Sequence, residues 1–111
     1  MGNRANVLIK QGAEQVCLYT HWNGDDLPRT LQNAFIRGES RLNDFQYLTR
    51  IVFCEMLAGT NPGSLTGYGI SQVPHDGNDH IITVNVDAQT VQINAKPSLS
   101  FIDFLTFGGR W

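Results

Sequence analysis

The residues best suited to chemistry lie in one short stretch, Tyr19-Thr20-His21-Trp22-Asn23-Gly24-Asp25-Asp26. Tyrosine and tryptophan offer flat surfaces for stacking, and the imidazole of His21 can donate or accept a proton. His21 with Asp25 or Asp26 could form the acid–base pair of a small hydrolase or nuclease. The same stretch also fits a structural role, in which Trp22 packs on the core and an aspartate caps a helix.

A second chemically competent group is His75, Asp76, Asp79 and His80. Histidine and carboxylate side chains can ligate a metal, or serve the same hydrolase or nuclease alternative. The four residues lie in one tight turn around Gly77, however, and their spacing matches no metal motif. A polar hairpin loop accounts for them, so we expect neither a metal nor a cofactor. A nucleophile elbow and a cofactor fingerprint are also missing, so we assign no catalytic residue.

Arg50 and Tyr68 complete the set of candidate site residues. Arg50 interrupts an apolar run, so its guanidinium must reach solvent or find an anionic partner. Glu55 lies five residues away, a poor spacing for an ion pair within one helix. Tyr68 stands between Gly67 and Gly69, which would let the backbone approach a ligand closely.

We therefore hypothesise that one binding surface contains Tyr19, His21, Trp22, Arg50 and Tyr68. A flat aromatic ring, an imidazole and a permanent cation together suit an anionic planar ligand such as a nucleotide. The alternative is that Trp22 belongs to the core and Arg50 pairs with a carboxylate elsewhere.

The elements that must position these residues follow from hydrophobic periodicity. Residues 4–10 and 15–21 predict a β-hairpin, because two short strands flank a turn that contains Gly12. A helix is predicted from Asp25–Asp26 to Gly38, with Pro28 in its first turn. A second helix, from about Asn43 to Gly59, should be the main core element, since one face carries Phe45, Leu48, Val52 and Met56.

The second half of the chain predicts more strand. A strand is possible near Tyr68–Val73, and strict alternation in residues 80–86 and 91–94 predicts a further hairpin. The apolar tail from Ser98 onward could form a short helix capped by Ser98 or Ser100. Hairpins without regular βαβ alternation favour an α+β fold with an antiparallel sheet of four to five strands, in the order ββ-αα-βββ, and two helices on one face.

Composition limits the class of protein. The chain has 111 residues, which predicts a single domain over residues 1–111. Its net charge of −2 argues against non-specific binding to nucleic acid, although six of its eight basic residues are arginine. No segment predicts a membrane span or a signal peptide, so we expect a cytoplasmic protein. Cys54 lies in an apolar run and should be a core thiol, and the apolar tail could mediate homo-oligomerisation.

Several short motifs resemble a group of small uncharacterised bacterial and phage proteins. They are the opening Met1-Gly2-Asn3-Arg4-Ala5-Asn6, which fits M-G-x-R-A-N, and Tyr19-Thr20-His21-Trp22-Asn23-Gly24, which fits Y-x-H-W-x-G. The segments Leu48-Thr49-Arg50-Ile51 and Thr66-Gly67-Tyr68-Gly69-Ile70 also look similar. This resemblance implies a phage or mobile-element origin and assigns no chemistry to any residue.

The function we expect is a small non-enzymatic binding module. It would act as a phage-type inhibitor of a host protein or as a binder of a small anionic ligand. The hydrolase or nuclease described above is the alternative, and a structural protein that oligomerises through its tail is a third possibility.

Overall fold

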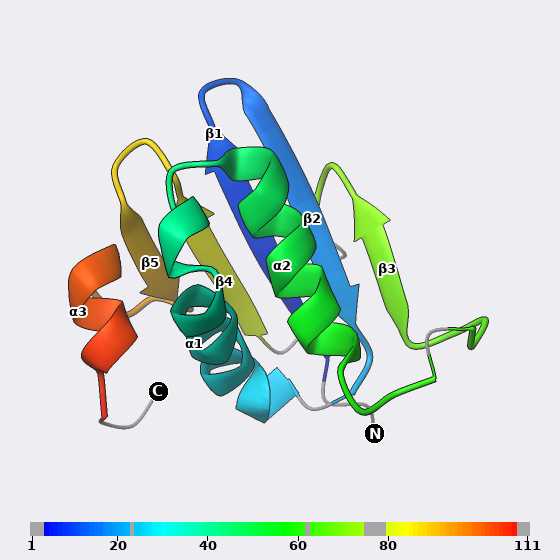
Figure 1. Cartoon of the computed structure of the whole chain (residues 1–111). Helices are drawn as coiled ribbons and strands as arrows, with labels where there is room; N and C mark the ends of the chain where they lie inside the picture. The colour runs from blue at the N-terminus through cyan, green and yellow to red at the C-terminus, as the bar shows by residue number, and fades with distance from the viewer. Residues whose placement is uncertain (1–3, 23, 62, 75–79, 109–111) are drawn as a thin grey trace.

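Six strands form one mixed sheet in the computed structural model, which describes residues 4–22, 24–61, 63–74 and 80–108 (Figure 1). The order across the sheet is β3-β2-β1-β4-β5-β6. The strands are β1 (Ala5–Gln11), β2 (Glu14–Thr20), β3 (Tyr68–Ser71), β4 (His80–Asn85), β5 (Thr90–Ile93) and β6 (Leu99–Ser100). The hairpin of β1 and β2 turns at Gly12, whose φ of +58° suits glycine.

The sheet departs from the predicted antiparallel arrangement at its centre. β1 and β4 are parallel neighbours, with Val7 opposite Ile82, whereas all other neighbouring strands are antiparallel. β3 pairs with β2 and β4 pairs with the other edge of β1, so the two hairpins meet along β1 and β4. The predicted count of four to five strands and the order ββ-αα-βββ are also incomplete, because β6 and a third α-helix follow β5.

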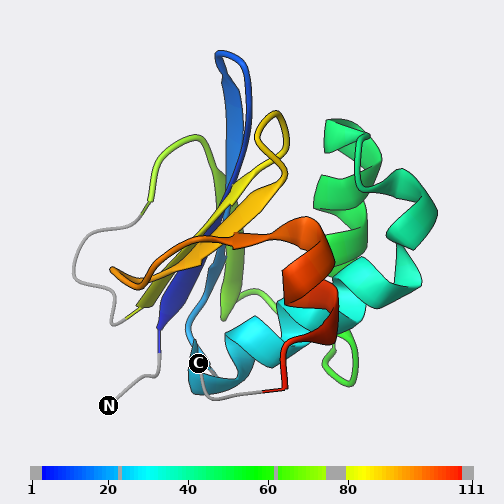
Figure 2. The same ribbon diagram turned by 90° about the vertical axis from the view of Figure 1, so that its left-hand side faces the viewer.

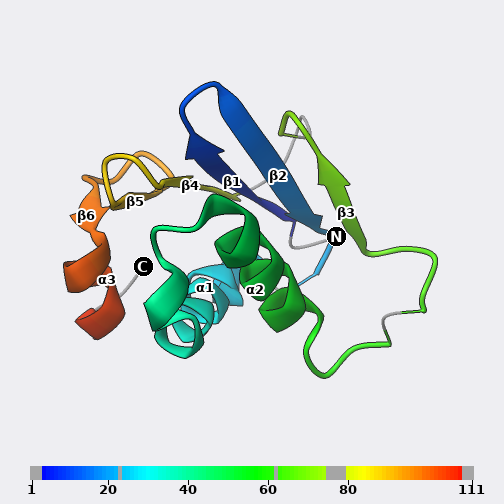
Figure 3. The ribbon, with the colours of Figure 1, turned by 45° about the horizontal axis from the view of Figure 1, so that its top comes forward.

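Three α-helices of the described residues lie on one side of this sheet (Figures 2 and 3). They are α1 (Leu27–Arg37), α2 (Phe45–Leu57) and α3 (Phe101–Thr106). The predicted core stripe of α2 is confirmed, since Phe45, Leu48, Val52 and Met56 are all buried. The opposite face of α2 is open to solvent, since Tyr47, Arg50 and Cys54 are exposed.

The helix ends follow the sequence closely. Asp44 caps α2, its carboxylate accepting a hydrogen bond from the Tyr47 N–H at 3.2 Å. Asp26 takes the same position before α1, with Pro28 in the first turn, but the Asp26 side chain makes no capping hydrogen bond. An ion pair of 2.6 Å between Arg37 and Glu55 joins the two helices. Glu55 thus pairs with the preceding helix.

The apolar tail folds back on the core. Ser100 caps α3 by accepting a hydrogen bond from the Asp103 N–H at 3.0 Å, as one of the two predicted caps. Phe101 and Phe104 are buried, and both rings pack edge-on against Phe35 with centroids 4.9 and 5.2 Å from it. These rings serve the fold of the chain itself, so they are not free to mediate the oligomerisation that the sequence suggested.

The two cysteines differ in burial. Cys54 lies on the outer side of α2 and is exposed, so the prediction of a core thiol is wrong. Cys17 is fully buried, and its thiol donates a hydrogen bond to Asn6 Oδ1 at 3.2 Å. Burial raises the pKa of the Cys17 thiol from 9.0 to about 11, against a smaller lowering by a hydrogen bond with Ser71.

Thiol reactivity should separate these two residues. In the native protein at pH 8, iodoacetamide should alkylate Cys54 alone, because the Cys17 thiol is buried and protonated. In urea both should react, as peptide mass spectrometry would show. Alkylation of native Cys17 at the rate of Cys54 would contradict the assignment.

The raised pKa of Cys17 also means that the folded state holds this proton more tightly than the unfolded state. The contribution of Cys17 to stability is therefore complete below pH 9 and declines as the pH rises through about 11.

Candidate functional site

The end of β2 places Trp22 in a fixed position beside the helices. The Thr20 hydroxyl donates a hydrogen bond to the Trp22 carbonyl at 2.8 Å and accepts one from the Trp22 N–H at 3.2 Å. The His21 ring meets the indole edge-on, with the centroids 4.5 Å apart. Trp22 is nevertheless 48% exposed, so it is not the core residue that the structural alternative required.

Gly67 forms the surface against which the indole lies. Its φ of +99° is strained for any residue with a side chain, and a Cβ at this position would overlap Trp22 Nε1. The loop is held there because the His21 N–H donates to the Gly67 carbonyl at 2.8 Å. The sequence indicated that glycine here permits a close approach, and the approaching group is the indole of the same chain.

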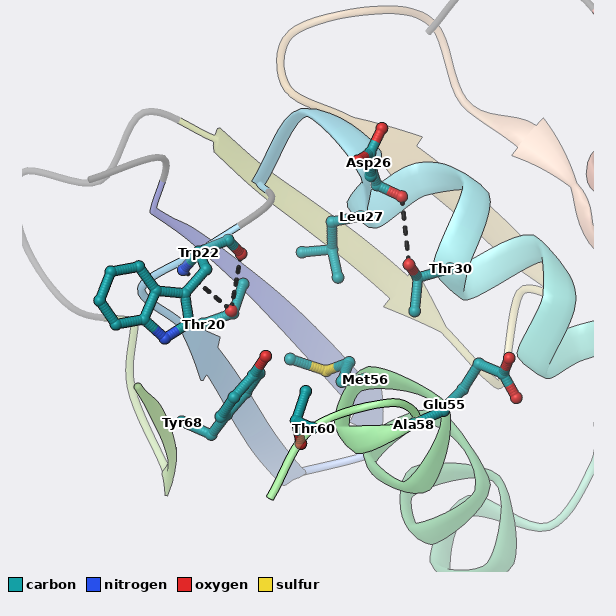
Figure 4. A pocket seen from close by; sticks show the side chains of 10 residues that line it. All are labelled: Thr20, Trp22, Asp26, Leu27, Thr30, Glu55, Met56, Ala58, Thr60 and Tyr68. Atoms are coloured by element: carbon teal, nitrogen blue, oxygen red, sulfur yellow. Dashed lines mark hydrogen bonds between the residues drawn. The ribbon is translucent and has the colours of Figure 1, made fainter. Parts of the chain in front are cut away.

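Trp22 and Tyr68 form one side of a pocket of about 180 Å³ (Figure 4). Leu27 and Met56 lie across from the two rings, and Glu55 stands at the rim. The complete lining combines aromatic, apolar, hydroxyl and carboxylate side chains from β2, β3 and both long helices: Thr20, Trp22, Asp26, Leu27, Thr30, Glu55, Met56, Ala58, Thr60 and Tyr68. We call this the Trp22 pocket.

The charged groups of the Trp22 pocket are acidic. None of the ten described lining residues is lysine, arginine or histidine, whereas Asp26 and Glu55 are carboxylates. Glu55 is compensated by Arg37 at 2.6 Å. The Asp26 carboxylate makes no ion pair with any described residue. The pocket therefore offers an anion no positive partner, and it disfavours the anionic ligand that we expected from the sequence.

The five predicted site residues fall into three groups. Trp22 and Tyr68 share the pocket. Tyr19 lies on the sheet face away from the helices, since it alternates with Leu18 and Thr20, and its hydroxyl is 3.1 Å from His21 Nδ1. Arg50 lies on the outer side of α2, where its guanidinium donates a hydrogen bond to Cys54 Sγ at 3.9 Å.

Arg50 does not reach the other four residues because of helical phase. It is two residues from both Leu48 and Val52, which point at the sheet, so its side chain points the opposite way. The structure therefore does not bring Arg50 together with Trp22 and Tyr68, and no ion pair joins Arg50 to a carboxylate among the described residues. The sequence analysis missed Met56 and Thr60, whose place in the pocket depends on where α2 ends.

The residues of the hydrolase alternative are arranged differently from the expectation. Asp25 Oδ1 contacts His80 Nε2 at 2.8 Å, while His21 pairs with Tyr19 instead of an aspartate. Around the Asp25–His80 pair, the described residues that line the adjoining cavity include no serine, threonine or cysteine as nucleophile: Gly24, Asp25, Pro28, His80, Ile82, Ile93 and Asn94. His75, Asp76 and Asp79 lie outside the described residues.

None of the described helices is long and apolar enough to cross a membrane. No family model, curated protein or solved structure matches this chain.

Proposed function

We propose that the protein is a small non-enzymatic binding module whose site is the Trp22 pocket. The observation that carries the proposal is the half-exposed indole, seated on Gly67 beside Tyr68 at the mouth of a formed pocket. An exposed tryptophan that is held rigidly by the backbone suits recognition, because little conformational freedom is lost when a partner packs on it.

The size of the pocket favours a side chain of a partner protein over a nucleotide. Its volume of about 180 Å³ is below the roughly 300–1,000 Å³ of pockets that enclose small molecules. One side chain inserted from a protein surface requires less room than a base, a sugar and a phosphate. A host protein as partner, and inhibition of that protein, are in keeping with the resemblance to phage proteins.

The lining further favours a basic side chain, with arginine the best fit. A guanidinium stacks on the face of tryptophan or tyrosine, and Asp26, the lining carboxylate without an ion-pair partner among the described residues, favours a positive charge over a negative one. A phosphate or carboxylate would be repelled by Asp26, which has no ion-pair partner among the described residues, whereas the charge of Glu55 is balanced by Arg37. Charge therefore distinguishes this proposal from the anionic ligand.

The test is a titration of the full chain followed by NMR, with N-acetyl-arginine amide and AMP as probes. A Trp111→Phe background leaves Trp22 as the only indole, since the chain has two tryptophans. Capped arginine should shift the Trp22 indole N–H and the amides of Thr60 and Tyr68. A single residue should bind weakly, with a Kd on the order of 1 mM or above. AMP should shift none of these signals.

Trp22→Ala should abolish these shifts while the rest of the spectrum stays folded. Tyr47→Ala is the matched control, because Tyr47 is an equally exposed aromatic at 47%, away from the pocket lining. Binding of AMP but not of capped arginine would show that the pocket takes anions, and no response to either probe would refute the proposed site.

A further inference from the structure

The edge of the sheet formed by β3 carries no charged residue that would oppose strand pairing. From Thr60 to Pro74 the chain has no aspartate, glutamate, lysine, arginine or histidine. Edge strands of soluble proteins commonly carry a lysine, an inward charge or a bulge that blocks another strand. β3 is a terminal strand of the sheet and carries none of the charges. At the opposite edge, β6 has only two residues and leads directly into α3.

The same uncharged segment exposes large apolar side chains. Ile70 is 64% exposed, because α2 covers β1 and β2 and does not extend over β3 (Figures 1 and 3). Leu65, in the loop beside the start of β3, is 98% exposed, and Val73 beyond its end is also exposed. Apolar groups that flank an open strand edge on both sides are a common mark of an interaction surface.

The hydrogen-bond pattern defines which backbone groups this edge offers. The register pairs Thr20 with Tyr68, and the His21 N–H donates to the Gly67 carbonyl, so Gly67 faces β2. Backbone groups alternate along a strand in an antiparallel ladder, so Gly69 and Ser71 also face β2. The N–H and C=O groups of Tyr68 and Ile70 therefore point to the free edge.

We propose that β3 pairs antiparallel with β3 of a second copy of this chain, which joins the two sheets. A two-fold axis at Gly69 places Tyr68 of each copy opposite Ile70 of the other. In that register the outward N–H and C=O groups of both residues find partners across the axis. The strand is thus complementary to itself.

Side chains support the same register. Tyr68 and Ile70 lie on one face of the sheet, opposite Thr20 and Leu18 of β2. The axis would therefore place an aromatic ring beside a β-branched side chain twice, a favourable cross-strand pair. Gly69 meets its own copy on the other face without obstruction. Each chain has a net charge of −2, but the segment from Thr60 to Pro74, which carries this edge, contributes no charged residue to the seam.

Analytical ultracentrifugation of the full chain over a concentration series tests the proposal. The wild type should move from 12.4 kDa toward twice that mass as concentration rises. Ile70→Lys should weaken dimerisation at least tenfold, because it introduces a charge opposite Tyr68 of the second copy. Ile102→Lys is the matched control, since Ile102 is an exposed isoleucine on α3, and it should dimerise as the wild type does.

Hydrogen exchange locates the seam independently of the mass. The amides of Tyr68 and Ile70 should become protected as the concentration rises, at least tenfold in the dimer, and this gain should be absent in Ile70→Lys. A wild type that stays monomeric to several hundred micromolar would overturn the proposal, even if an extended peptide bound the edge. Loss of the dimer in Ile102→Lys alone would place the interface on α3 and overturn it equally.

The dimer and the proposed pocket function can fail separately. Trp22→Ala should still dimerise, because Trp22 contributes no group to the β3 edge. Monomeric Ile70→Lys should still bind capped arginine, because Ile70 does not line the Trp22 pocket.

Discussion

Val52→Asp should leave the chain unfolded at 25 °C. Val52 is fully buried at the centre of α2, where its side chain faces the sheet within the main apolar cluster. An unpaired carboxylate there costs several kcal/mol, or must take up a proton to avoid that cost. Domains of this size have a total stability of about 5–15 kcal/mol, and the lost valine packing adds to the deficit. Far-UV circular dichroism and a thermal melt would measure the loss.

Arg50→Asp is the matched control for Val52→Asp. This variant also introduces an aspartate into α2, two positions away from Val52 and on the exposed side of the helix. Arginine has a higher helix propensity than valine, so Arg50→Asp loses at least as much helix propensity as Val52→Asp, and a larger loss of stability in Val52→Asp reports burial. Arg50→Asp should melt cooperatively close to the wild type. A Val52→Asp protein that is soluble and melts cooperatively would contradict the assigned core.

Local periodicity was sufficient to predict most elements of this fold. The alternation of Ile82, Val84 and Val86 gave a strand with one buried face, and the spacing of Leu27, Leu31 and Phe35 gave a helix. It was harder to predict which strands lie side by side and whether they run parallel or antiparallel. A strand with one buried face has the same pattern beside a parallel or an antiparallel partner. The parallel pairing of β1 and β4 depends on which edges β3 leaves free, a property of the whole sheet.

The errors at the candidate site have a local cause. Arg50 and Cys54 were interpreted from their apolar neighbours in the sequence, although both lie two residues from Val52. At 100° per residue, that separation turns a side chain to the far side of the helix, so helical phase predicts their exposure. Trp22 and Tyr68 line the same pocket because β2 ends where β3 begins. The role of Gly67 in seating the indole required coordinates, since no pattern specifies which group approaches a glycine.

Gly67→Ala should disable the Trp22 pocket without changing any residue that lines it. An alanine at a φ of +99° is strained, at a cost of about 1–3 kcal/mol in the free energy of unfolding. Its Cβ would also overlap the indole nitrogen of Trp22 and lie 3.3 Å from the Trp22 Cδ1. The ring must therefore move away from Tyr68, and the surface proposed to stack on an arginine is lost. Binding of capped arginine should weaken at least tenfold.

Gly69→Ala separates this effect from a general intolerance of alanine in the strand. Gly69 lies two residues away in β3, its φ is outside the left-handed region, and an added Cβ would meet only Tyr19 Cδ2 at 4.0 Å. The free energy of unfolding of the Gly69→Ala protein should stay within about 0.5 kcal/mol of the wild type, and this variant should still bind capped arginine.

The fluorescence emission spectrum of Trp22, recorded in the Trp111→Phe background, reports the environment of the ring directly. It should change in Gly67→Ala and stay constant in Gly69→Ala. If Gly67→Ala bound the probe normally with the indole displaced, Trp22 would not be the recognition surface, and the pocket proposal would fail at its central residue.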